Sequence, residues 1–138
     1  MKTAVIYRSM TGHSKKIARA VAAAIGAEAV NIKDNPALSG IDLLFVVGGI
    51  YSEESLPETI GLIKTLNGAK VKKAALITSS MSDKAGQDEA RKILESNGIE
   101  VLDEYRCRGN FLFVKLGHPN AREIDGAVRF AEKLAEKH

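Results

Sequence analysis

The chain has 138 residues, about the length of one domain, of which 45% are hydrophobic and 27% charged, a balance typical of globular proteins that argues against disorder. Its 20 basic and 17 acidic residues are interleaved and leave a net charge of only +3, which argues against nucleic-acid binding. No apolar run approaches the roughly 18 residues of a membrane span, and the first residues do not resemble a signal peptide. We therefore expect a single domain over 1–138, located in the cytoplasm, with no nucleic-acid or membrane partner.

Apolar runs alternate with helical patterns along the chain, which indicates an α/β fold with a mainly parallel sheet. In chain order we expect strands at Thr3–Tyr7, Ala29–Ile32, Leu43–Val47, Ala74–Thr78 and Ile99–Arg106. The first, third and fourth runs are continuously apolar, as in strands covered on both faces, whereas the second and fifth alternate, which suits the edges. The predicted architecture is a doubly wound, five-stranded parallel sheet of order 2-1-3-4-5 with helices on both faces.

The fifth run alternates between apolar and charged side chains, so its two faces can be assigned from the sequence. One side, interrupted by Asp103, carries Ile99, Val101, Tyr105 and Cys107. The other side carries Glu100, Glu104 and Arg106. Cys107 is the only cysteine and cannot form an internal disulfide, so we expect a packed thiol rather than a redox group.

Helical spacing fills the segments between the strands. The first helix has an apolar stripe through Ile17, Val21 and Ile25 and should end at Gly26. The second opens with a capping box that begins at Ser55. It faces inward through Leu56, Ile60 and Ile63.

Two more helices are predicted towards the end of the chain. The third carries Ala90, Ile93 and Leu94 and stops at Asn97-Gly98. The last begins at Asn120 and buries Ile124, Ala127, Val128, Ala131 and Leu134. Only nine residues, Lys33 to Ile41, connect the second and third strands, so any helix there is about one turn long.

The most informative segment, Ser9–Ser14, reads SMTGHS and joins the first strand to the first helix. The free N–H groups and partial positive charge of a helix N-terminus stabilise a phosphate. Gly12 allows a tight turn close to such an anion, and three hydroxyls can donate hydrogen bonds to it. The spacing matches neither GxxxxGK[ST] nor GxGxxG, which argues against a nucleoside-triphosphate loop and a dinucleotide fold. The alternative is a Ser or Thr N-cap on an ordinary helix beside solvated lysines.

These residues resemble a known family. The pattern [ST]-x-T-G-x-[ST] is the phosphate-binding signature of flavodoxins, and Ser9, Thr11, Gly12 and Ser14 match it. The run Gly48-Gly49-Ile50-Tyr51 is similar to the second flavin loop of that family. Two further runs resemble a short-chain flavodoxin-like group: Cys107-Arg108-Gly109 and Gly117-His118-Pro119-Asn120. The resemblance extends over nearly the whole chain and implies a flavodoxin-like fold with non-covalently bound FMN.

The resemblance also implies three groups of cofactor-binding residues. The phosphate would be held by backbone N–H groups and hydroxyls of Ser9, Met10, Thr11, Gly12, His13 and Ser14. The isoalloxazine would be lined by Gly48, Gly49, Ile50, Tyr51 and Ser52, with Tyr51 either stacking on the ring or lying as a partly exposed loop residue. The pyrimidine side would be met by the third loop after the fourth strand, with Ser79, Ser80 and Met81.

Two departures from the family pattern bear on function. The third loop offers Met81 where flavodoxins often place an aromatic residue, which leaves one flavin face open or covered by the thioether. The strongly acidic surface usual in the family is also missing, because the net charge is +3.

The family resemblance predicts an FMN-binding electron-transfer protein that shuttles single electrons between redox proteins, because no substrate acid, base or nucleophile is visible and flavin chemistry belongs to the cofactor. We expect no metal site, and a monomer or weak dimer. One alternative is a small FMN-dependent NAD(P)H reductase of quinones or nitro compounds, favoured by an open flavin face. Another is an interaction domain of the same fold without cofactor. A phosphorylated receiver domain is excluded because Gly48-Gly49 follows the third strand where it needs an aspartate, and a thiol phosphatase because Cys107 starts no Cys-x5-Arg motif.

Overall fold

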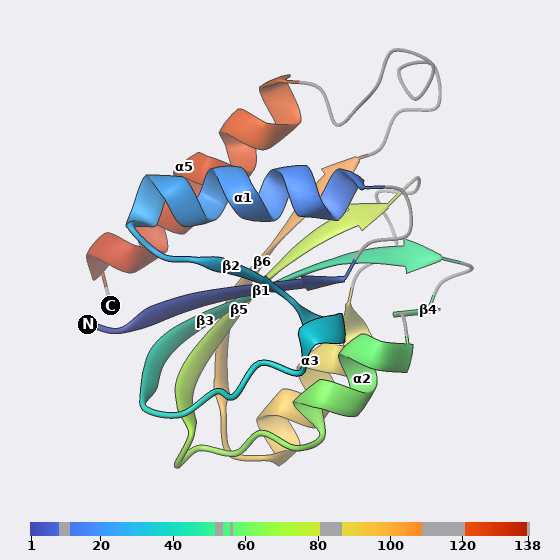
Figure 1. The fold of residues 1–138 in the computed structure, drawn as a ribbon, viewed down its shortest axis with the longest axis vertical. Coiled ribbons are helices and arrows are strands. Elements are labelled where there is room, and N and C mark those ends of the chain that lie inside the picture. Colours follow the sequence, from blue (N-terminus) through green and yellow to red (C-terminus); the bar gives the residue numbers. More distant parts are fainter. Residues whose placement is uncertain (9–11, 52–53, 56, 81–86, 109–120, 138) are drawn as a thin grey trace.

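The computed structural model describes residues 1–8, 12–51, 54–55, 57–80, 87–108 and 121–137. For 13, 49–51, 54–55, 79–80, 107–108 and 121–123 it describes the backbone alone. Figure 1 shows a twisted central sheet with helices α1 and α5 on one face and helices α2 and α3 on the other. Within the described ranges, no helix combines the length and apolar character that crossing a membrane requires.

The sheet consists mainly of five parallel strands: β1 (Thr3–Arg8), β2 (Ala29–Asn31), β3 (Ile41–Tyr51), β5 (Val71–Ser80) and β6 (Glu100–Arg108). Their order across the sheet is β2-β1-β3-β5-β6, and every pairing between them is parallel. This confirms the predicted order 2-1-3-4-5. A two-residue strand, β4 (Glu54–Ser55), pairs antiparallel with the last two residues of β3 and forms a short hairpin that was not predicted.

The helices follow the predicted sequence of elements: α1 (His13–Ile25), the 3-10 turn η1 (Ile32–Asp34), α2 (Pro57–Ile63), α3 (Asp88–Ser96) and α5 (Ala121–Lys137). The single turn η1 occupies the short crossover from β2 to β3, as expected from its length. Gly26 ends α1 in the left-handed conformation that glycine tolerates, with φ of 69°. α2 begins at Pro57, a position that proline favours, and Ser55 lies in β4. Leu56 and Asn120 lie outside the described residues.

Alternate residues of the central strands are buried on opposite faces of the sheet. On the face of α2 and α3, the strand core includes Ile6, Leu44 and Leu76. On the face of α1 and α5, it includes their neighbours Val5, Phe45 and Ile77. Because each central strand packs against helices on both sides, its sequence is apolar without interruption.

The structure corrects the predicted faces of the last strand. β6 pairs with β5 through Ala74↔Val101 and then Leu76↔Glu104, so one extra residue is inserted in β6 between these pairs. This bulge reverses the alternation: Val101 packs on the face of α2 and α3, whereas Tyr105 packs on the face of α1 and α5. Glu104, expected beside the exposed charged residues of an edge strand, is turned inwards, and its side chain is only 5% exposed.

The structure also moves the predicted boundary between strands and loops. β3 continues to Tyr51 and β5 to Ser80, and their ladder includes Gly48↔Thr78 and Gly49↔Ser79. Residues 48–51 and 79–80 are therefore strand residues rather than loop residues. Glycine and serine have low β propensity, but neighbouring strands on both sides supply the hydrogen bonds that extend the ladder.

Candidate functional site

The N-terminus of α1 lies directly after the first strand and has no side-chain cap. Its N-cap is Gly12, in the left-handed conformation with φ of 86° and ψ of −5°. The Lys16 N–H donates to the Gly12 carbonyl at 3.2 Å, and the first turn contains no acidic residue. The N-cap is thus a glycine rather than a Ser or Thr, and it has no side chain with which to accept from the N–H groups of the first turn.

The side chain of Ser14 is buried at this helix end. It is 1% exposed, and its Oγ has no hydrogen-bond partner among the described residues. A buried hydroxyl without a partner costs free energy, so such groups are normally paired with protein, water or ligand. The hydroxyl and the N–H groups at the start of the helix together match the donor set that binds a phosphate or another oxyanion.

The carboxyl ends of β1 and β3 lie side by side next to this helix end, with Arg8 paired to Gly48. The helices that follow the two strands, α1 and α2, cover opposite faces of the sheet (Figure 1). This is the topological switch point at which doubly wound sheets bind ligands. The Nη2 atom of Arg8 lies 3.8 Å from Oε1 of Glu58, which joins the end of β1 to the first turn of α2.

Gly48, near the end of β3, faces the side chain of a buried glutamine, Gln87. A Cβ atom on Gly48 would stand 3.2 Å from Oε1 of Gln87, the residue that precedes α3. Gln87 is 1% exposed, and its Nε2 lies 3.2 Å from each of three acceptors: Val46 O, Ile77 O and Thr78 Oγ1. A side chain at position 48 would therefore crowd the Gln87 amide, so the glycine has a packing role separate from any contact with a ligand.

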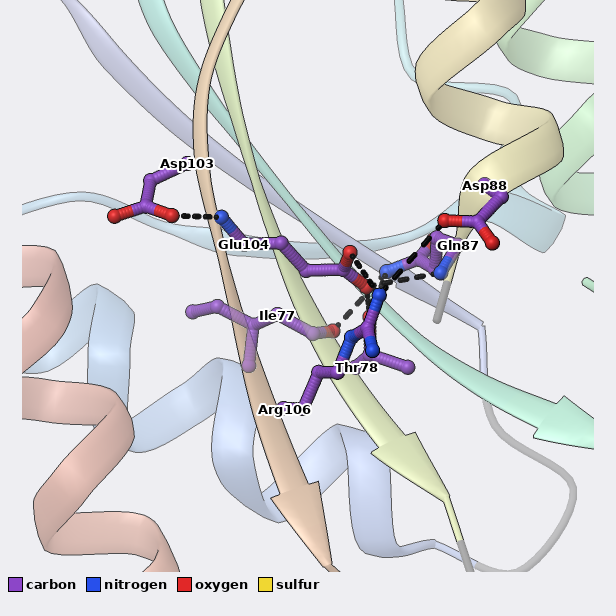
Figure 2. A network of polar contacts seen from close by, with 7 residues as sticks. All are labelled: Ile77, Thr78, Gln87, Asp88, Asp103, Glu104 and Arg106. Atoms are coloured by element: carbon purple, nitrogen blue, oxygen red, sulfur yellow. Dashed lines mark hydrogen bonds and ion pairs between the residues drawn. The ribbon is translucent and has the colours of Figure 1, made fainter. Parts of the chain in front are cut away.

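A buried carboxylate completes this polar cluster (Figure 2). Oε2 of Glu104 accepts a hydrogen bond from the Thr78 hydroxyl and another from the Gln87 backbone N–H at 2.9 Å. Nη2 of Arg106 lies 3.5 Å from Oε1 of Glu104 and 3.8 Å from Oδ1 of Asp88. We call Thr78, Gln87, Glu104 and Arg106 the Glu104 cluster.

The structure brings most of the predicted site segments to one end of the sheet. Gly12 and Ser14 lie at the start of α1, Gly48 to Tyr51 form the end of β3, and Ser79 and Ser80 form the end of β5. Five predicted site residues lie outside the described residues: Ser9, Met10, Thr11, Ser52 and Met81. Only the backbone is described for His13, Ile50, Tyr51, Ser79 and Ser80, so the stacking role of Tyr51 stays a prediction.

The sequence analysis missed Gln87 altogether and placed Glu104 on the wrong face. The sequence around Glu104 carries no signal for its burial, because Asp103 and Arg106 beside it are charged as well and the bulge depends on pairing with β5. Within the part of the chain that the structure describes, no group of three His, Cys, Asp or Glu residues is arranged to hold a metal ion.

The fold and the site together define a doubly wound α/β protein with a candidate anion-binding crevice at its switch point. Residues 4–121 match the model of the Flavodoxin domain family. Because this match covers most of the chain, the protein belongs to the flavodoxin domain family. That membership supports a redox flavoprotein in general.

Individual proteins are also similar to this chain in sequence or in fold. An uncharacterised protein of Methanocaldococcus jannaschii is 27% identical over 149 aligned positions, which cover 97% of this chain and 98% of that protein. A flavodoxin from the domain Archaea has a TM-score of 0.72 at 15% identity and covers 99% of this chain and 98% of its own. An azoreductase from Bacillus anthracis has a TM-score of 0.68 at 11% identity, with both chains covered completely. The two solved structures share the fold of this chain.

Proposed function

We propose that this protein binds FMN non-covalently and carries single electrons between redox proteins. The observation that carries the proposal is the buried Ser14 hydroxyl at the start of α1, which has no hydrogen-bond partner among the described residues. Family membership and the position of this helix end at the switch point of the sheet give the same indication. We further propose that the chain acts in the cytoplasm as a single domain, as a monomer or weak dimer.

The residues at this helix end fit the phosphate of FMN. The N–H groups that follow Gly12 and the Ser14 hydroxyl would donate to the phosphate oxygens. Lys15 and Lys16 are exposed in the first turn, where a cation opposes the helix dipole and a bound dianion offsets that cost. An acidic side chain in this turn would repel the phosphate, and none is present.

The ends of β3 and β5 would receive the flavin ring. Gly49 pairs with Ser79 there, next to the pair of Gly48 with Thr78, so the two predicted ring-binding segments are adjacent in the ladder. When bound, FMN supplies the chemistry by taking up and releasing electrons. The contribution of the chain is to bind the phosphate, to orient the ring at the end of the sheet and to limit the access of water.

The experiment compares the affinity of the apoprotein for FMN and for riboflavin, which lacks the phosphate. Ser14→Ala removes one hydrogen bond to a charged group, so FMN affinity should fall about ten- to hundredfold while riboflavin affinity is unchanged. Ser96→Ala, at an exposed serine in the last turn of α3, is the matched control and should change neither affinity. Equal affinity of the unmodified chain for FMN and riboflavin would contradict phosphate binding at this site.

A second candidate is an FMN-dependent NAD(P)H reductase, because the azoreductase shares the fold over its full length. Steady-state oxidation of NAD(P)H with an added quinone or nitro compound distinguishes the two roles. An electron carrier should show little turnover with the small acceptor and should reduce or oxidise a redox protein. An interaction domain without cofactor would bind no FMN in the titration above.

A further inference from the structure

Glu104 is an unusual residue for a buried position beside a hydrophobic layer. Its side chain is 5% exposed on the face that α3 covers, where Thr78 is a polar neighbour and the preceding residues Ala74 and Leu76 of β5 are apolar. Both of its carboxylate oxygens have partners, with Thr78 and Gln87 on one and Arg106 on the other. A buried charge is costly unless it is paired and hydrogen-bonded, and this one satisfies both conditions.

The two residues that donate to Oε2 flank the connection between β5 and α3. Thr78 lies near the end of β5, before the connection, and Gln87 is the N-cap of α3, after it. A single oxygen atom therefore links the end of β5 to the start of α3, in addition to the hydrogen bonds of the Gln87 side chain to β5. The bulge in β6 is what directs Glu104 to this point.

The Gln87 side chain extends the same cluster to β3. Its Nε2 lies 3.2 Å from the Val46 carbonyl and 3.2 Å from the Ile77 carbonyl, which belong to neighbouring strands. Its Oε1 has no hydrogen-bond partner among the described residues and faces the Cα of Gly48.

We propose that Glu104 is a positioning residue for the flavin-binding end of the sheet. Through Thr78 and Gln87 it holds the ends of β3 and β5 at the spacing that the flavin ring needs. The inference rests on the proposed function, but its mechanical part, the ordering of these strand ends, applies to the apoprotein as well. Glu104 itself pairs with Leu76, before the end of β5, so it acts on the strand ends through other residues.

The test uses Glu104→Ala and Glu104→Gln, with Glu100→Ala as the matched control at an exposed glutamate of the same strand. Glutamine keeps a carbonyl oxygen that can accept from both Thr78 and Gln87, whereas alanine leaves two buried donors without an acceptor. Three quantities are measured: hydrogen exchange of the Gln87 amide in the apoprotein, FMN affinity, and the midpoint potential of bound FMN. Circular dichroism checks that each variant is folded.

We expect Glu104→Ala to speed exchange of the Gln87 amide at least tenfold, to weaken FMN binding about tenfold or more and to shift the midpoint potential. Glu104→Gln should restore exchange and affinity to within about threefold of the unmodified chain, and Glu100→Ala should leave all three quantities unchanged. If alanine prevents folding, Gln87→Met tests the same connection and should weaken FMN binding in a folded protein.

Two results would overturn the inference. One is slow Gln87 exchange with unchanged affinity and potential in Glu104→Ala. The other is an equal loss in the glutamine variant, since this would assign the effect to charge rather than position. If the unmodified chain binds no FMN, the proposed function fails, and the exchange measurement still decides whether Glu104 orders the start of α3.

Discussion

Replacing Gly48 with alanine probes the contact between the end of β3 and the buried Gln87 side chain. The new Cβ would stand 3.2 Å from Oε1, 3.5 Å from Cδ and 3.7 Å from Nε2 of Gln87. The first distance is shorter than an ordinary van der Waals contact, so the amide has to move. Its three contacts through Nε2 are already 3.2 Å long, and a shift of a few tenths of an ångström carries them towards the limit of a hydrogen bond.

We expect Gly48→Ala to lower the free energy of unfolding by about 1–3 kcal/mol, the usual cost of overpacking with a weakened buried hydrogen bond. The assay is urea unfolding of the apoprotein, so that no cofactor contributes. Gly61→Ala is the matched control, because Gly61 is exposed in α2 with no atom within 4 Å of its Cβ position. In a helix this change should stabilise by about 0.5–1 kcal/mol. A Gly48→Ala protein as stable as the unmodified chain would refute the reasoning.

Two further predictions concern other parts of the molecule. Gly126→Ala places a Cβ against the hydroxyl of Tyr105, so unfolding free energy should fall by about 3 kcal/mol, and adding Tyr105→Phe should recover part of the loss in a thermal melt. The backbone N–H of Lys2 donates to Asp42 and, with the charge of Lys72, holds the pKa of Asp42 below its usual 3.8. A lowered folded-state pKa gives stability that is present above pH 3.8 and lost as the pH falls through the folded value. Asp42→Asn should therefore reduce the loss of unfolding free energy as the pH falls between about 5 and 2. An unchanged pH dependence of the unfolding free energy would contradict the assignment.

The element order and the position of the first helix end could be predicted because both depend on local patterns, whereas the cofactor site itself stays a prediction. Continuous apolar runs identify central strands, and the position of Gly12 before a helical pattern identifies the helix end. The runs that are apolar on both faces indicate the central strands, so the order 2-1-3-4-5 could be predicted from the sequence. Gly26 likewise ends α1 as expected from glycine's tolerance of positive φ.

The Glu104 cluster could not be predicted, because the hydrogen bonds that bury Glu104 and Gln87 depend on residues distant in the sequence. The Gln87 amide and the Glu104 carboxylate are 17 positions apart, and Gln87 reaches Val46 across 41 positions. The bulge that directs Glu104 inwards exists only once β6 is paired with β5. Gly48 illustrates the same difficulty, since its pattern indicated a flavin loop while its Cα packs against Gln87.

The most direct test of the central claim is an amide NMR titration of the apoprotein with FMN and then with riboflavin. The account predicts that FMN shifts the amide resonances of Gly12 and Ser14, and that riboflavin leaves these two unchanged while shifting those of Gly49 and Ser79. FMN binding that leaves the Gly12 and Ser14 amides where they are in the apoprotein would contradict the assignment of the phosphate to the start of α1.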